Sequence, residues 1–117
     1  MDPLKLTVYC TFQNNPISNN IKFFLRPILP DEIKAIKLAY RSKDESEFRF
    51  LQMNTQTDLM PSYQITIYEV PAGLRIEFYF IVTLIDGSEK ILKKQGHTID
   101  YTILKSHPAT LRMDLTI

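Results

Sequence analysis

The clearest pattern in the chain is the alternation of apolar and mixed side chains over residues 74–85. Because successive side chains of a strand point to opposite faces, a period of two over this length predicts a long strand with one buried face. Asp86 and Gly87 follow it, and glycine accepts the positive φ of a tight turn, so residues 89–93 are predicted to return as a hairpin partner. The apolar positions are Leu74, Ile76, Phe78, Phe80, Val82 and Leu84.

Shorter alternating segments recur along the rest of the chain, separated by residues that favour turns. Several such segments spaced about a dozen residues apart predict an antiparallel β-sandwich of about 7–9 strands. The segment 111–117 is either an extra edge strand or the start of a linker. The predicted strands cover residues 4–12, 21–25, 48–53, 63–67, 99–103 and 111–117, with loops at 13–20 and 54–62.

Residues 31–41 fit two different structures. Good helix formers follow a proline, and Ile33, Ile36 and Tyr40 fall at helical spacing, which favours a helix. A strand would instead place Ile36, Leu38 and Tyr40 on one face. We predict a strand, because the surrounding segments are all β and tertiary context often overrides local propensity.

Length and composition narrow the classes of protein to consider. The 117 residues are enough for one domain, and 44% apolar with 23% charged residues is typical of a globular chain. A net charge of +1 provides no general attraction for nucleic acid, and no apolar run approaches the roughly 20 residues of a membrane span. We therefore expect residues 1–117 to form a single domain, either complete or a module of a larger protein, without nucleic-acid binding or membrane insertion.

Candidate catalytic and metal-binding residues are few. His97 and His107 lie in or beside predicted loops, with no cysteine or carboxylate at ligand spacing, so surface histidines are expected. Cys10 falls on the apolar side of a predicted strand, which favours an inert core thiol over a nucleophile. The oxygen-bearing residues 86–89 could bind calcium but are also an ordinary hairpin turn, which we favour.

An acidic cluster in the predicted turn at residues 42–46 and just after it could in principle serve acid–base chemistry. Mixed charges in an exposed turn favour a solvated hairpin tip instead. No nucleophile and base can be paired from the sequence, so the prediction is a non-enzymatic protein without cofactor or metal. The cluster comprises Asp44, Glu45 and Glu47, opposite Lys43 and Arg49.

Aromatic residues offer the other candidate site, since the chain has seven phenylalanines and six tyrosines. Sugar rings stack on exposed flat aromatics, so a carbohydrate-binding surface would need several on one face. Most of the aromatics are expected to fill the core, with tyrosines at its edges and their hydroxyls in water. The tyrosines that could face outward are Tyr9, Tyr40, Tyr68 and Tyr79.

The segment 33–92 resembles an immunoglobulin-like or fibronectin type III-like β-sandwich module, of the kind found in bacterial surface proteins and carbohydrate-active enzymes. The likeness is carried, in order, by IKLAYRS, FRFLQM, YQITIYEVPAG and LRIEFYFIVTLIDGS. Tryptophan, which many such sandwiches bury, is absent, and the segment from His97 onward is longer than such a module needs.

This resemblance implies an all-β immunoglobulin-like sandwich that acts as a structural or protein-interaction module. Its partner would be another protein or a neighbouring domain of the same chain, bound through a sheet surface or an edge strand such as 111–117. The resemblance slightly favours a location outside the cytoplasm. The alternative is a carbohydrate-binding module that uses exposed tyrosines on a glycan.

Overall fold

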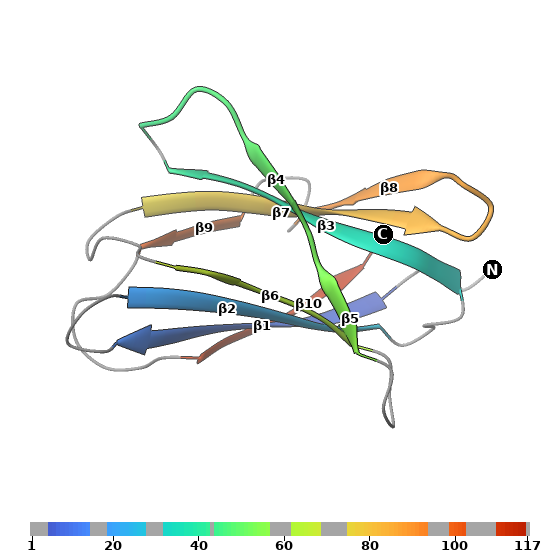
Figure 1. Ribbon diagram of the computed structural model, residues 1–117, viewed down its shortest axis with the longest axis horizontal. Helices are drawn as coiled ribbons and strands as arrows, with labels where there is room; N and C mark the ends of the chain where they lie inside the picture. The colour runs from blue at the N-terminus through green and yellow to red at the C-terminus, as the bar shows by residue number, and fades with distance from the viewer. Residues whose placement is uncertain are drawn as a thin grey trace.

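The computed structural model is a two-layer β-sandwich, 44 × 33 × 20 Å in extent (Figure 1). It describes residues 5–14, 19–27, 32–42, 44–56, 62–68, 75–93, 99–102 and 110–116. The predicted all-β, antiparallel sandwich is confirmed. The strands are β1 (Lys5–Asn14), β2 (Asn19–Pro27), β3 (Ile33–Ser42), β4 (Arg49–Gln52), β5 (Asn54–Gln56), β6 (Ser62–Ile67), β7 (Arg75–Leu84), β8 (Glu89–Leu92), β9 (Ile99–Thr102) and β10 (Thr110–Thr116).

The two sheets are antiparallel throughout the described strands. The first sheet has the order β10-β1-β2-β6-β5, and the second has the order β4-β3-β7-β8 with β9 also paired to β7. Strand β7 pairs with β3 along one edge, while β8 and β9 share its other edge. The C-terminal segment is therefore an added strand, because β10 pairs with β1 at the edge of the first sheet.

Strand β3 settles the ambiguity of residues 31–41 in favour of the strand prediction. It pairs with β7 from Ile33 to Ser42, with one register shift between Ile33 and Ala35. Ile36 and Leu38 are buried on the face that meets the other sheet. Burial between two sheets therefore outweighs the helical preference of these residues.

Strands β4 and β5 are successive parts of one segment that passes from the second sheet to the first. β4 pairs with β3, and β5 pairs with β6, with only Met53 between them (Figure 1). Met53 is buried, and its backbone N–H donates to the Ile36 carbonyl at 2.9 Å. The predicted loop at 54–62 is thus wrong for Asn54–Gln56, which continue the chain as an edge strand.

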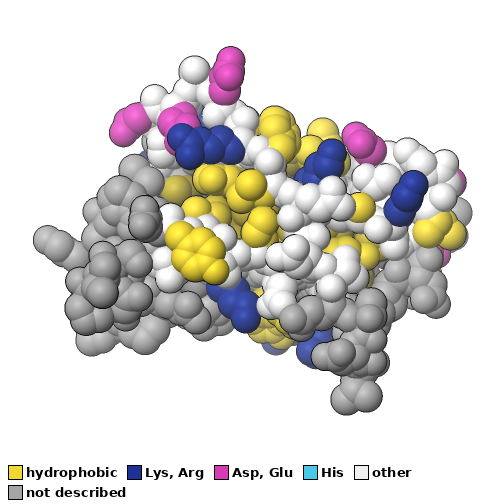
Figure 2. Space-filling view, viewed as in Figure 1, with side chains coloured by type: hydrophobic (Ala, Val, Ile, Leu, Met, Phe, Trp, Pro, Cys, Tyr) yellow, Lys and Arg dark blue, Asp and Glu magenta, His cyan; other side chains and the backbone are white. Residues whose placement is uncertain are grey.

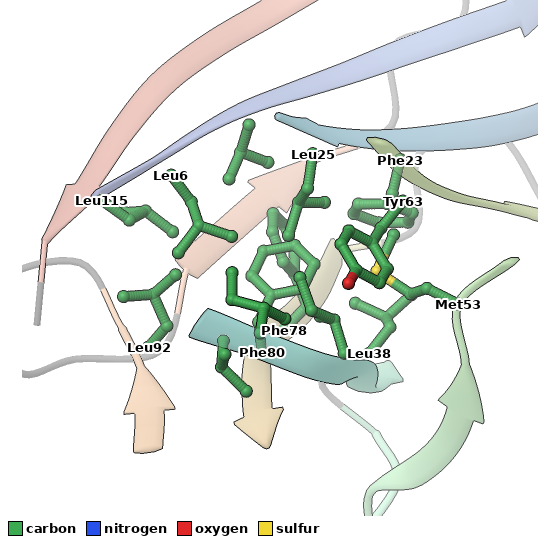
Figure 3. Close-up of a cluster of buried hydrophobic side chains, with 14 of the residues drawn as sticks. Leu6, Phe23, Leu25, Leu38, Met53, Tyr63, Phe78, Phe80, Leu92 and Leu115 are labelled. Carbon is green, nitrogen blue, oxygen red and sulfur yellow. The ribbon is translucent and has the colours of Figure 1, made fainter. Parts of the chain in front are cut away.

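The core lies between the sheets and is built from the inward positions of both. Three phenylalanines occupy its centre: Phe23 from β2, and Phe78 with Phe80 from β7. The Phe23 ring meets Phe78 edge-on, with 5.0 Å between centroids, and lies 6.2 Å from Phe80. Figure 3 shows these rings between aliphatic side chains of both layers. The buried alternation of β7 confirms the predicted strand over Arg75–Leu84, whereas Ile85 already belongs to the following turn.

The turn between β7 and β8 forms as its sequence predicts. Gly87 has a φ of 89°, which a glycine adopts without steric cost. The Asp86 carboxylate accepts hydrogen bonds from the backbone N–H of Ser88 at 2.8 Å and from its hydroxyl at 2.6 Å. These bonds lower the pKa of Asp86. The carboxylate is thus occupied by its own turn, as in an ordinary hairpin.

Candidate functional site

An aromatic pair lies on the outer face of the first sheet, away from the core. Val8 and Phe23 point inward and are fully buried, so alternation turns their neighbours Tyr9 and Phe24 outward. These two residues are direct partners across β1 and β2. Their rings are partly buried, with centroids 6.2 Å apart and planes tilted by 54°. The pair presents an apolar surface of two rings on an otherwise polar face.

Polar side chains extend this pair across the whole sheet. Arg112 of β10 lies opposite Tyr9, Gln64 of β6 lies opposite Phe24, and Asn54 of β5 lies opposite Gln64. We call these five residues the Tyr9–Phe24 row. A row of this kind offers aromatic surface at its centre, with hydrogen-bonding groups on both sides.

Two guanidinium groups flank the aromatic pair. The Arg112 guanidinium carbon lies 6.0 Å from the centroid of the Tyr9 ring, and that of Arg26 lies 5.8 Å from the Phe24 ring. Both distances are within the range of a cation–π contact. Asp114 accepts a hydrogen bond from the Thr7 hydroxyl at 3.0 Å and lies 3.9 Å from Arg112. The aromatic pair thus lies between two positive charges.

The outer face of the second sheet carries a different, more apolar surface, the Tyr79 patch. Phe50 and Ile91 are 55% and 58% exposed, although both are large and apolar. Tyr79 lies on β7, between the strands β4 and β8 that carry these two residues, with the Phe48 ring edge-on at 5.1 Å and the Lys93 ammonium 5.4 Å from its centroid. Figure 2 shows hydrophobic side chains on the surface where β4 crosses β3 and β7, beside the charged β3–β4 turn. The Tyr79 patch comprises Phe48, Phe50, Tyr79, Ile81 and Ile91.

Arg41 holds the β3–β4 turn against this patch. Its guanidinium donates to the Ser46 carbonyl at 3.1 Å and to the Glu77 carboxylate at 3.2 Å. The same group stacks on Phe48, with 4.4 Å between the guanidinium carbon and the ring centroid. These contacts hold Phe48 beside Tyr79 at one edge of the patch.

The tyrosines predicted as candidates do not share one surface. Tyr9 and Tyr79 lie on opposite outer faces, Tyr68 is 69% exposed just beyond β6, and Tyr40 packs against the core. Phe24, the partner of Tyr9, was not predicted, because only tyrosines were expected to face outward. The signal was present in the Phe23–Phe24 doublet, since alternation along a strand must turn one of two adjacent rings outward.

The acidic cluster lies at the exposed β3–β4 turn. Glu45 accepts hydrogen bonds from the Ser42 backbone N–H at 3.3 Å and from Arg49 Nε at 3.2 Å. The Ser42 N–H, followed by the Arg49 charge, lowers the pKa of Glu45, so this carboxyl is poorly suited to act as an acid. Glu45 therefore closes the turn locally, and Asp44 and Glu47 beside it are exposed.

The other candidate residues fall largely outside the described positions. His97, His107 and the side chain of Cys10 are among them, so their predicted roles stay predictions. Among the described residues, no group of three or more histidines, cysteines and carboxylates could hold a metal ion. No helix in the same part of the chain is long and apolar enough to cross a membrane.

Comparison with known proteins gives a likeness in fold. No protein-family model matches the sequence, and no curated protein matches it. Among solved structures, the chain is similar to the crystal structure of a bromine derivative of BhCBM56, with a TM-score of 0.56 and 10% sequence identity. The likeness covers 81% of this chain and 91% of that one. At this identity it shows a shared β-sandwich fold, one that is also used by a protein named as a carbohydrate-binding module.

Proposed function

We propose that this domain binds a glycan chain, without catalysis, across the outer face of the β10-β1-β2-β6-β5 sheet. The observation that carries the proposal is the Tyr9–Phe24 row, which places two partly buried rings between hydrogen-bonding side chains of neighbouring strands. The C–H groups of a sugar ring carry partial positive charge and pack against the negative face of an aromatic ring. Arg112, Gln64 and Asn54 would bond to the hydroxyls at the sugar's edge.

The fold supports this proposal in two ways. Its likeness to BhCBM56 relates the sandwich to a protein named as a carbohydrate-binding module. With β4, β9 and β10 set aside, the order β1-β2-β6-β5 facing β3-β7-β8 is similar to that of immunoglobulin-like sandwiches. This order supports the proposal that the domain is immunoglobulin-like in the broad sense.

The direct test is an amide NMR titration of the isotope-labelled domain with soluble glucans, xylans, chitin oligomers and galacturonans. We expect shifts centred on Tyr9 and Phe24, and about tenfold weaker binding after Tyr9→Ala, which corresponds to about 1.4 kcal/mol. Tyr79→Ala is the matched control, since it removes the same ring from the opposite face. Shifts centred on Tyr79, or no shifts with any glycan, would refute the proposal.

A second candidate function is protein docking through the Tyr79 patch. It is favoured by Phe50 and Ile91, which are more than half exposed in spite of their size. The two functions respond to different substitutions. Phe50→Glu should abolish docking of a protein partner or neighbouring domain and leave glycan binding unchanged, whereas Tyr9→Ala should do the reverse.

A further inference from the structure

Charge is unevenly divided between the strands of the first sheet and the rest of the chain. These strands contain four basic residues, Lys5, Lys22, Arg26 and Arg112, and one acidic residue, Asp114, which gives a net charge of +3. The whole chain has a net charge of only +1. The register places Lys22, Arg26, Arg112 and Asp114 on the outer-face positions of their strands. The face proposed to bind glycan is thus strongly positive in an almost neutral protein.

Two of these charges lie where a bound sugar chain would run. Arg112 and Arg26 contact the rings of Tyr9 and Phe24, respectively, so a guanidinium flanks each member of the aromatic pair. Arg26 is exposed, and the Arg112 side chain is 62% exposed. When a guanidinium stacks on an aromatic ring, its N–H groups still point outward in the guanidinium plane. Two of them can then bind a carboxylate through parallel hydrogen bonds.

Asp114, the one acidic residue in the described strands of this sheet, leaves both guanidinium groups largely available. Asp114 lies 3.9 Å from Arg112, at the outer limit of an ion pair, and both side chains are more than 60% exposed. Exposed ion pairs of this kind contribute little to stability, typically less than about 1 kcal/mol. Among the ion pairs of the described residues, none involves Arg26. A ligand carboxylate would therefore displace only one weak contact.

We infer that the glycan bound by this face is anionic, with a charged group next to each sugar that stacks on the aromatic pair. The inference rests on the proposed glycan binding and adds the chemical class of the ligand. Gln64 and Asn54 can serve the hydroxyls of any sugar, whereas Arg112, Arg26 and Lys22 are donors only and carry positive charge, which favours a ligand with anionic acceptors. Uronates and sulfated sugars supply such acceptors, as carboxylate or sulfate oxygens, together with negative charge.

The experiment compares one sugar backbone in two charge states by calorimetry: de-esterified galacturonan and its fully methyl-esterified, neutral form. We expect about tenfold tighter binding of the charged form at low salt, with the preference falling as salt rises. Arg26→Gln and Arg112→Gln should each reduce this preference for the charged form about threefold, and Asp114→Asn should increase the preference. Lys37→Gln, which removes one positive charge from the opposite sheet, is the matched control.

The outcomes separate this inference from the function on which it rests. Equal binding of both galacturonans would overturn the anionic preference and leave glycan binding intact, whereas binding of neither, nor of any other glycan, would overturn both. Equal losses from Lys37→Gln and Arg26→Gln would show a general charge effect and refute the site. Binding of dextran sulfate but not galacturonan would support the anionic class and assign the sulfate. Tighter binding of single-stranded DNA than of any glycan would overturn the inference in favour of a nucleic-acid ligand.

Discussion

The contact between Phe23 and Phe78 joins the two sheets at the centre of the sandwich, and its strength can be measured. The residues come from β2 and β7, are at most 1% exposed, and meet edge-on with centroids 5.0 Å apart. Substituting each with leucine, singly and together, gives a double-mutant cycle. Leucine keeps the site apolar, whereas alanine at either position would cost about 3–5 kcal/mol, close to the whole stability of a marginal domain.

The expected magnitudes follow from the groups that are removed. Phe→Leu deletes three carbon atoms from a fully buried side chain, worth about 2 kcal/mol at about 0.8 kcal/mol per buried carbon. The edge-on pairing of Phe23 with Phe78 adds about 1 kcal/mol that either substitution removes. Each single variant should therefore lose about 3 kcal/mol of unfolding free energy. The double variant should lose about 5 kcal/mol, leaving a coupling of about 1 kcal/mol.

Urea unfolding followed by far-ultraviolet circular dichroism measures all four free energies, provided that the m-value stays constant across the set. The control cycle pairs Phe23→Leu with Leu92→Ala. Leu92 is also fully buried but lies at the opposite end of the cluster (Figure 3), so these two losses should be additive within about 0.5 kcal/mol. A Phe23–Phe78 coupling no larger than that of the control would refute the inference that this ring pair ties the sheets together.

Three further predictions concern the turn, the core tyrosine and the Arg41 contact. Gly87→Ala should cost about 1 kcal/mol of unfolding free energy, because alanine is strained at a φ of 89° even though its methyl group meets nothing within 4 Å; no change in thermal midpoint would contradict this. Burial raises the pKa of Tyr63, so the neutral hydroxyl contributes fully to stability below pH about 10, and this contribution declines as pH rises through the folded-state pKa. In urea titrations between pH 9 and 11, the Tyr63→Phe variant should therefore lose less unfolding free energy than the parent. Glu77→Gln should cost about 1 kcal/mol and loosen the β3–β4 turn, since Arg41 would lose a charged partner in a partly buried site; unchanged hydrogen exchange at that turn would count against the contact.

The strands could be predicted where burial imposes a pattern on the residues. Strand β7 was predictable because its alternating side chains separate a buried face from an outer one. Strand β3 required a choice between propensity and context, and context was the better guide. Strand β5 was missed because Asn54–Gln56 are three polar residues, whose strand conformation comes from pairing with β6 and not from any burial pattern.

The candidate site was harder to predict, because it depends on register between strands that are distant in sequence. Tyr9 was a candidate from its position on a strand, but its pairing with Phe24 follows from the β1–β2 register. Its contact with Arg112 requires β10 to return beside β1, more than a hundred residues later. Alternation assigns a side chain to a face, but it does not say which side chains on that face are neighbours.

The arrangement of the two outer faces makes glycan binding and protein docking compatible in one domain. The Tyr9–Phe24 row and the Tyr79 patch lie on opposite sides of the sandwich, separated by the core, so a polymer on one face leaves the other accessible. Covering Phe50 and Ile91 with a neighbouring domain would remove apolar surface from water at about 25 cal/mol per Å². The positive face, in contrast, would act by charge and lose affinity as salt rises. A chain that carries Phe50→Glu should therefore keep its salt-dependent glycan binding, and this retention would separate the two surfaces.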